Sequence, residues 1–113
     1  MPTLIIKTNA KLADDRAPFL KAASAVVADM LGKPERYVMV LLEPTPDMCF
    51  GGDTAPLAYL ELKSLGLPEQ RTPDFSNILC RFIETHLKVP SERIYIDFAA
   101  PERHMFGFDG GTF

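Results

Sequence analysis

Segments with strand and helix patterns follow one another twice, in the same order, along these 113 residues. Identical residues recur at a nearly constant interval: Lys7 and Lys63, Phe19 and Phe75, and Leu31 and Leu87 are 56 positions apart, and Glu35-Arg36 and Glu92-Arg93 are 57 apart. The order strand, helix, strand holds in both halves independently of these identities. We therefore predict an α+β fold of two βαβ units. Right-handed connections then place both helices on one face of a four-stranded mixed sheet.

The first unit is predicted from its apolar periodicity. A β-branched and apolar run, residues 3–6, follows Pro2 and indicates a strand, whose first position tolerates a missing N–H. Asp14 and Asp15 can cap a helix whose apolar residues recur at helical spacing over 19–31. Gly32 and Pro34 end this helix, and the run YVMVLL at 37–42 predicts the next strand.

The second unit has the same order. A loop rich in proline and glycine, 43–56, leads to a predicted strand at 57–65. Thr72 and Pro73 indicate the N-cap and first position of a helix with an apolar stripe over 75–87. A last strand is predicted at 94–98, and the tail, which alternates aromatic residues with glycines, predicts a short hairpin.

Composition and charge limit the class of protein. With 47% hydrophobic and 24% charged residues, we expect a single globular domain over 1–113. The net charge of −3 gives no broad electropositive surface, so no nucleic-acid partner is expected. The start shows no leader pattern, and no apolar run approaches the ~20 residues of a membrane span. We therefore expect a cytoplasmic protein without a membrane partner.

The sheet raises a burial problem. Its strands appear apolar on both faces, whereas the helices cover only one, and monomers rarely expose apolar patches beyond a few hundred Å². We therefore expect other copies of the chain to cover the second face.

No metal or cofactor is expected. The candidate ligands His86, His104, Cys49 and Cys80 show no recognisable ligand spacing, and two cysteines are too few for a disulfide framework. The Gly51-Gly52 pair lacks the Lys-Ser/Thr of a phosphate loop and indicates a turn.

Two polar residues have ordinary structural explanations beside a functional one. Lys33 follows a predicted helix, where a cation gains about 0.3–1 kcal/mol from the helix dipole. Asp97 lies between Ile96 and Phe98 in a predicted strand, where alternate side chains face solvent. The residues by themselves leave both readings open.

Six segments, in order, carry a resemblance to a known family: MPTLIIKTNA, LGKPERYV, MCFGG, LKSLG, RIYIDF and GTF. Together they resemble the macrophage migration inhibitory factor family of the tautomerase superfamily over the full length of the chain. The resemblance implies a homotrimer whose sheets surround a central channel, with an active site at each subunit boundary. Such an assembly would cover the second face of the sheet.

In that family the initiator methionine is removed, and the proline behind it uses its free secondary amine as an acid-base catalyst. The corresponding residue here is Pro2. Because burial or a nearby cation disfavours a protonated amine, an apolar pocket containing Lys33 would leave a competent base near neutral pH. A retained Met1 would instead convert this nitrogen into an amide without useful basicity.

The resemblance also implies the substrate-binding positions. Lys33 corresponds to the lysine that binds the substrate carboxylate, and Leu65, beside Ser64, to the residue whose backbone amide contacts the substrate. Tyr95 and Asp97 correspond to polar positions contributed by the neighbouring subunit. The implied aromatic wall consists of Tyr37, Phe106, Phe108 and Phe113. The implied reaction is keto-enol tautomerisation of a small aromatic α-keto acid such as phenylpyruvate, without a cofactor.

The chain departs from the family pattern at three places. Leu57-Ala58-Tyr59-Leu60 stands where animal members have a CxxC motif, so a thiol-disulfide activity is not expected. Asp97 replaces an asparagine and would repel an acidic substrate unless it is protonated or paired. Phe108 replaces an indole and removes a hydrogen-bond donor from the aromatic wall.

Two other functions are compatible with the sequence. The chain could be a cytokine-like or partner-binding protein with vestigial tautomerase activity, or a trimer with a structural role alone. The missing secretion signal does not separate these functions, because the animal proteins it resembles leave cells without one.

Overall fold

The computed structural model describes all residues 1–113 and confirms the doubled order of strand, helix and strand. The main elements are β1 (Thr3–Thr8), α1 (Ala17–Leu31), β2 (Met39–Pro44), β3 (Ala58–Lys63), α2 (Thr72–Leu87) and β4 (Ile94–Ala99). A small hairpin of β5 (Gly107–Phe108) and β6 (Gly111–Thr112) ends the chain. Short 3-10 turns lie at Glu35–Tyr37, Glu69–Arg71, Ser91–Arg93 and Arg103–Met105.

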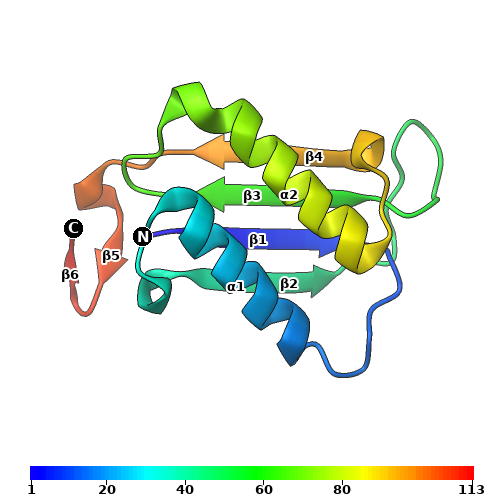
Figure 1. Ribbon diagram of the computed structural model, residues 1–113, viewed down its shortest axis with the longest axis horizontal. Helices are drawn as coiled ribbons and strands as arrows, with labels where there is room; N and C mark the ends of the chain where they lie inside the picture. The colour runs from blue at the N-terminus through cyan, green and yellow to red at the C-terminus, as the bar shows by residue number, and fades with distance from the viewer.

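The four long strands form one mixed sheet in the order β2-β1-β3-β4. Each βαβ unit supplies one parallel pair, β1 with β2 and β3 with β4, and the two units meet through the antiparallel pair of β1 and β3. Both helices lie on the same face of the sheet (Figure 1). The predicted α+β architecture is therefore confirmed.

The core lies between the sheet and the two helices. Alternate residues of the strands face it, with Leu4 and Ile6 of β1 beside Leu62 and Leu60 of β3, all four without exposed surface. The helices cover them with apolar stripes that include the fully buried Phe75 of α2. No helix of the chain is both long and apolar enough to cross a membrane.

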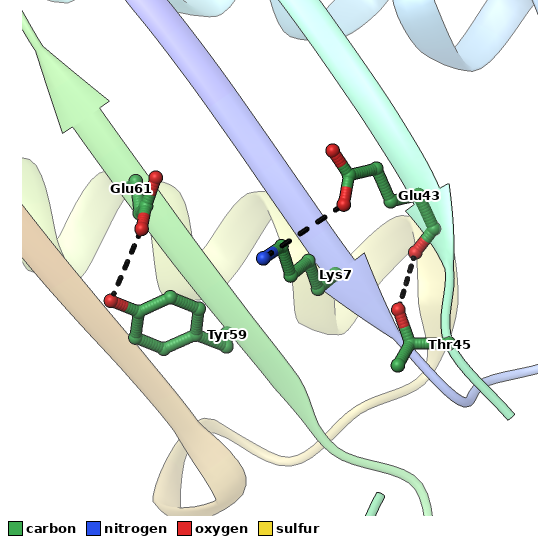
Figure 2. Close-up of polar contacts among 5 residues, drawn as sticks. All are labelled: Lys7, Glu43, Thr45, Tyr59 and Glu61. Atoms are coloured by element: carbon green, nitrogen blue, oxygen red, sulfur yellow. Dashed lines mark hydrogen bonds and ion pairs between the residues drawn. The ribbon is translucent and has the colours of Figure 1, made fainter. Parts of the chain in front are cut away.

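The other face of the sheet is more polar than the sequence led us to expect (Figure 2). Lys7 of β1 lies 3.9 Å from the Glu43 carboxylate of β2, and the Tyr59 hydroxyl lies 3.4 Å from Glu61, both on β3. Only Met39 among the large apolar residues of β1 to β3 is highly exposed there, at 60%. The expectation of strands apolar on both faces was therefore wrong in its extent, because each strand carries at least one charged or phenolic group on this face.

Several element boundaries also differ from the sequence prediction: the strand predicted at 57–65 spans only Ala58–Lys63, and two further differences have a clear cause. Tyr37 belongs to a 3-10 turn instead of a strand, because Pro34 directs the chain into a turn in which the Val38 N–H donates to the Glu35 carbonyl at 3.0 Å. Thr72 is the first residue of α2 instead of its cap, since its hydroxyl donates to the Glu69 carbonyl at 3.0 Å.

The start of α1 is stabilised in part as predicted. The N-cap position is Arg16, which makes no side-chain capping bond. The Asp15 carboxylate nevertheless accepts a hydrogen bond from the Ala17 N–H at 3.2 Å. One of the free N–H groups of the first turn is thereby satisfied.

Candidate active site

The N-terminal end of β1 lies beside the C-terminal hairpin, at one end of the sheet (Figure 1). Pro2 is fully buried there, and its carbonyl accepts a hydrogen bond from the Met39 N–H at 3.0 Å. The strand pairing therefore uses only the acceptor of Pro2, and the donor that proline lacks is not needed. This geometry fixes the position of the chain terminus relative to β2.

A hollow of about 470 Å³ opens in front of this terminus, and we call it the polar hollow for the two cations in its otherwise mainly apolar lining. Its lining brings together residues far apart in the sequence: Met1, Lys33, Tyr37, Leu65, Arg103 and Phe113. Lys33 reaches this place because Gly32 adopts a left-handed conformation (φ 62°) that ends α1, with the Lys33 N–H donating to the Ala28 carbonyl at 3.0 Å. Two predicted site residues, Lys33 and Leu65, are thus brought to the N-terminus.

The electrostatics of the hollow favour a neutral amine. Desolvation, and then the positive charges of Lys33 and Arg103, lower the pKa of the Met1 amine from its ordinary value of 8.0. No aspartate or glutamate lines the hollow to oppose these cations. A terminal amine at this place is therefore neutral to a greater extent than the same amine in water at a given pH.

A second hollow of about 330 Å³ shares Met1, Tyr37 and Phe113 with the first and is mainly apolar. Three contacts join its aromatic rings: the centroids of Tyr37 and Phe108 are 6.0 Å apart, those of Phe108 and Phe113 5.3 Å, and those of Phe106 and Phe113 6.0 Å. The structure therefore brings the four residues of the predicted aromatic wall together.

The hairpin that carries this wall is closed by a two-residue turn. Phe108 pairs with Gly111, and the intervening Asp109 and Gly110 both have positive φ, 50° and 79°. This is the arrangement of a type I′ turn, which Asp-Gly favours. The Phe113 N–H then donates to the Phe106 carbonyl at 3.2 Å, which holds the last ring against the wall.

Ser64 takes no direct part in either hollow. Its side chain is buried, its N–H donates to the Ala99 carbonyl at 3.0 Å, and its hydroxyl lies 3.5 Å from the Leu65 carbonyl. Its contacts instead fix the end of β3, where the chain turns to place Leu65 at the hollow.

Tyr95 and Asp97 lie away from the N-terminus of the same chain. Tyr95 is level with Tyr59 and Lys7, at the far end of β1. The four residue steps from Thr3 to Lys7 span about 13 Å of strand. Neither β4 residue lines the two hollows.

Asp97 is paired within its own chain on the face of the sheet opposite the helices. Its carboxylate lies 3.5 Å from the Tyr59 hydroxyl, which also approaches Glu61. Partial burial, together with the carboxylates of Asp97 and Glu61, raises the pKa of the Tyr59 phenol. Tyr59 therefore remains a hydrogen-bond donor to these acids at neutral pH.

Arg93 shapes the surroundings of Tyr95. Its guanidinium donates to the carbonyls of Pro56 (3.0 Å), Phe50 (3.3 Å), Asp53 (2.9 Å) and Ala55 (3.0 Å). The Phe50 ring then packs against Tyr95, with centroids 4.7 Å apart. One cation thus holds the loop before β3 against the start of β4.

Sequence reasoning missed two arginines at the site. Arg103 lines the polar hollow, and Arg36 lies over the Tyr37 ring with its guanidinium carbon 4.6 Å from the ring centroid. The available signal was the proximity of each to a predicted wall residue, Arg103 three positions before Phe106 and Arg36 directly before Tyr37. No group of three or more His, Cys, Asp or Glu side chains is placed to hold a metal ion.

The mixed sheet, its two helices and the proline at the start of β1 define a protein with the fold of the tautomerase superfamily. The family model described as macrophage migration inhibitory factor matches residues 1–113, and the chain belongs to this family.

Several named relatives and solved structures are similar over nearly the whole chain. The macrophage migration inhibitory factor homolog of Brugia malayi is 38% identical, with 100% of this chain and 99% of the relative covered. The homolog of Trichinella spiralis is 35% identical, with complete coverage of both. The crystal structure of the Prochlorococcus marinus homologue superposes with a TM-score of 0.92 at 38% identity, covering 98% of each chain.

Proposed function

We propose that the protein is a tautomerase that interconverts the keto and enol forms of arylpyruvates such as phenylpyruvate, with Pro2 as the acid-base catalyst after removal of Met1. The observation that carries this proposal is the position of the chain terminus between Lys33 and the aromatic wall. Cytoplasmic location and a single domain over 1–113 belong to the same proposal.

The proposed reaction moves one proton. The neutral Pro2 amine takes a proton from the carbon next to the keto group, which leaves an enolate and a protonated amine. The amine then returns the proton to the enolate oxygen, giving the enol, and the reverse sequence regenerates the keto acid. Because the same nitrogen accepts and donates, its pKa must lie close to the working pH.

Other residues of the chain bind and orient the substrate in this proposal. Lys33 binds the carboxylate through a charge-assisted hydrogen bond, and the aromatic wall packs against the ring of the substrate. The Leu65 N–H has no partner within the chain and can donate to the substrate, with Ser64 fixing its direction.

The proposed assembly is a homotrimer with shared sites. Within one chain Tyr95 and Asp97 are at the wrong place to reach the N-terminus, so they contribute only across a boundary between subunits. A head-to-tail contact repeated around a three-fold axis gives every terminus one neighbouring β4.

The decisive experiment is a spectrophotometric assay of phenylpyruvate tautomerisation with protein whose mass shows that Met1 has been removed. We expect the Pro2→Gly variant, similarly processed, to lose about a hundredfold to ten-thousandfold of kcat/KM. Protein that retains Met1 serves as a second comparison and should be equally impaired, because its Pro2 nitrogen is an amide. Equal rates for wild type and Pro2→Gly would exclude Pro2 as the catalyst.

A further inference from the structure

The two hollows carry more positive charge than a single carboxylate needs. Lys33 and Arg103 line the polar hollow, Arg36 lines the aromatic one, and no acidic residue of the chain lines either. This contrasts with the chain as a whole, whose net charge is −3. The excess of cations is therefore a local property of the site.

Arg103 is an arginine of the site without a side-chain partner inside the chain. Its guanidinium makes no hydrogen bond or ion pair within the chain, and the neighbouring Glu102 carboxylate lies 3.5 Å from the His104 ring. Other arginines are engaged: Arg81 with Glu84 at 2.9 Å and Arg93 with four loop carbonyls. The Arg103 guanidinium is thus free to bind a ligand.

A single chain and a substrate with one carboxylate leave Arg103 unmatched. A substrate with one carboxylate satisfies Lys33, and Arg36 lies on the Tyr37 ring. A neighbouring subunit would bring in Asp97, whose contact at 3.5 Å within its own chain is to the neutral Tyr59 hydroxyl, so Asp97 is the alternative partner of Arg103 that the binding test separates from a substrate carboxylate. A guanidinium prefers a planar anion that accepts two parallel hydrogen bonds, which a second carboxylate provides.

We infer that the site takes a dianionic 2-oxo acid, with one carboxylate on Lys33 and a second, carried at or next to the reacting carbon, on Arg103. This inference rests on the proposed function and names its substrate class. Both anionic groups lie in the polar hollow, and a ring on the same carbon extends into the aromatic hollow. Arg103 is then a specificity-determining residue that separates dicarboxylates from simple arylpyruvates.

The test uses two unreactive ligands that differ by one carboxylate. Phenylsuccinate is 3-phenylpropanoate with a second carboxylate on the carbon that bears the ring. Their Kd values are measured by titration calorimetry at one fixed salt concentration with Met1-processed protein. We expect wild type to bind phenylsuccinate about tenfold to a hundredfold more tightly than 3-phenylpropanoate, and Arg103→Gln to abolish that preference. Arg103→Lys should keep part of it.

Arg16→Gln is the matched control, because it removes one positive charge at the other end of α1 and lines neither hollow. It should preserve the preference. Three results would overturn the inference. Wild type could bind both ligands equally, the preference could survive in Arg103→Gln, or that variant could lose the same factor of affinity for both ligands. An equal loss of affinity for the two ligands would show that Arg103 instead acts on the terminal amine or pairs with Asp97 of a neighbouring subunit.

The two proposals fail in different measurements. Binding of unreactive ligands decides the role of Arg103 without any turnover. The rate of phenylpyruvate tautomerisation by Pro2→Gly decides the role of the proline, and that assay contains no dicarboxylate. A dianion preference that depends on Arg103 would therefore stand even if Pro2 proved not to be the catalyst.

Discussion

The carbonyl of Pro2 accepts a hydrogen bond from the Met39 N–H at 3.0 Å, so the first residue of the proposed mature chain is anchored by its acceptor while its nitrogen stays outside the sheet. The base in the proposed reaction is therefore attached directly to a strand. Desolvation, Lys33 and Arg103 lower the pKa of the Met1 amine, and we expect the Pro2 amine of the processed chain to experience the same two cations.

We predict that Lys33→Gln moves the acidic limb of the pH profile of kcat/KM to higher pH. Removing a neighbouring cation stabilises the protonated amine, so its pKa rises and less free base is present at a given pH below it. The measurement is kcat/KM for phenylpyruvate across the pH range, where KM also rises because the carboxylate loses its partner. Lys88→Gln, a change of the same charge at the far end of α2, should leave the limb in place. If the acidic limb of Lys33→Gln coincides with that of wild type, the charge of Lys33 does not affect the pKa of the catalytic amine.

We predict that two inactive variants restore activity when they are mixed. A Pro2→Gly subunit retains Tyr95, and a Tyr95→Ala subunit retains Pro2, so some boundaries in a mixed trimer combine both intact residues. When equal amounts of the two variant subunits assemble at random, about a quarter of the subunit boundaries should combine an intact Pro2 with an intact Tyr95. The measurement is the rate after joint refolding, with each variant refolded alone as the control. No recovery from assemblies shown by native mass to be mixed would place Tyr95 and Pro2 of each site on the same subunit.

We predict that Arg93→Ala lowers the free energy of unfolding by about 2–3 kcal/mol, because a charged donor to four carbonyls is lost. The change is measured by urea unfolding at one protein concentration. Arg81→Ala is the control: its 2.9 Å ion pair with Glu84 is exposed, and the cost should stay below about 1 kcal/mol. If both substitutions lower the free energy of unfolding by the same amount, the loop does not depend on the hydrogen bonds of Arg93.

We predict opposite effects for two phenylalanines. Phe108 is 53% exposed, so Phe108→Ala should barely change stability but raise KM for phenylpyruvate by about twofold to tenfold through loss of ring contacts. Phe75 is fully buried, so Phe75→Ala should cost about 3–5 kcal/mol of stability. Thermal unfolding and steady-state kinetics of both variants check the pair. An unchanged KM in Phe108→Ala would remove that residue from the substrate wall.

The fold could be predicted from the sequence because its information is local. The apolar periodicity of the helices and the glycine at 32 act over short stretches of chain, and the repeat at an interval of 56 residues indicates that one unit occurs twice. The structure confirms the two βαβ units. Boundaries were missed where a proline starts a turn, as at Tyr37. The hydrogen-bonding choice of Thr72 depends on the turn before it and cannot be obtained from its residue type.

The site was predicted less completely. The aromatic wall followed from a resemblance, and the structure brings its four rings together. Arg103 was missed because its importance comes from the missing acids around it, a property of the folded surface that no short motif carries. The polar character of the second sheet face was missed because Lys7 and Glu43 are paired only through the register of β1 and β2.

The contacts of Arg93 have a consequence for engineering. The hydrogen bonds of the guanidinium go only to main-chain oxygens, and the Asn9 amide likewise donates to the Thr54 carbonyl at 2.9 Å. Arg93 and Asn9 therefore hold this loop without using the side chains of Thr54 and Ala55, which are both exposed. Those two positions are suitable for attaching a spectroscopic reporter close to Tyr95, where it could follow subunit exchange in solution without disturbing the loop.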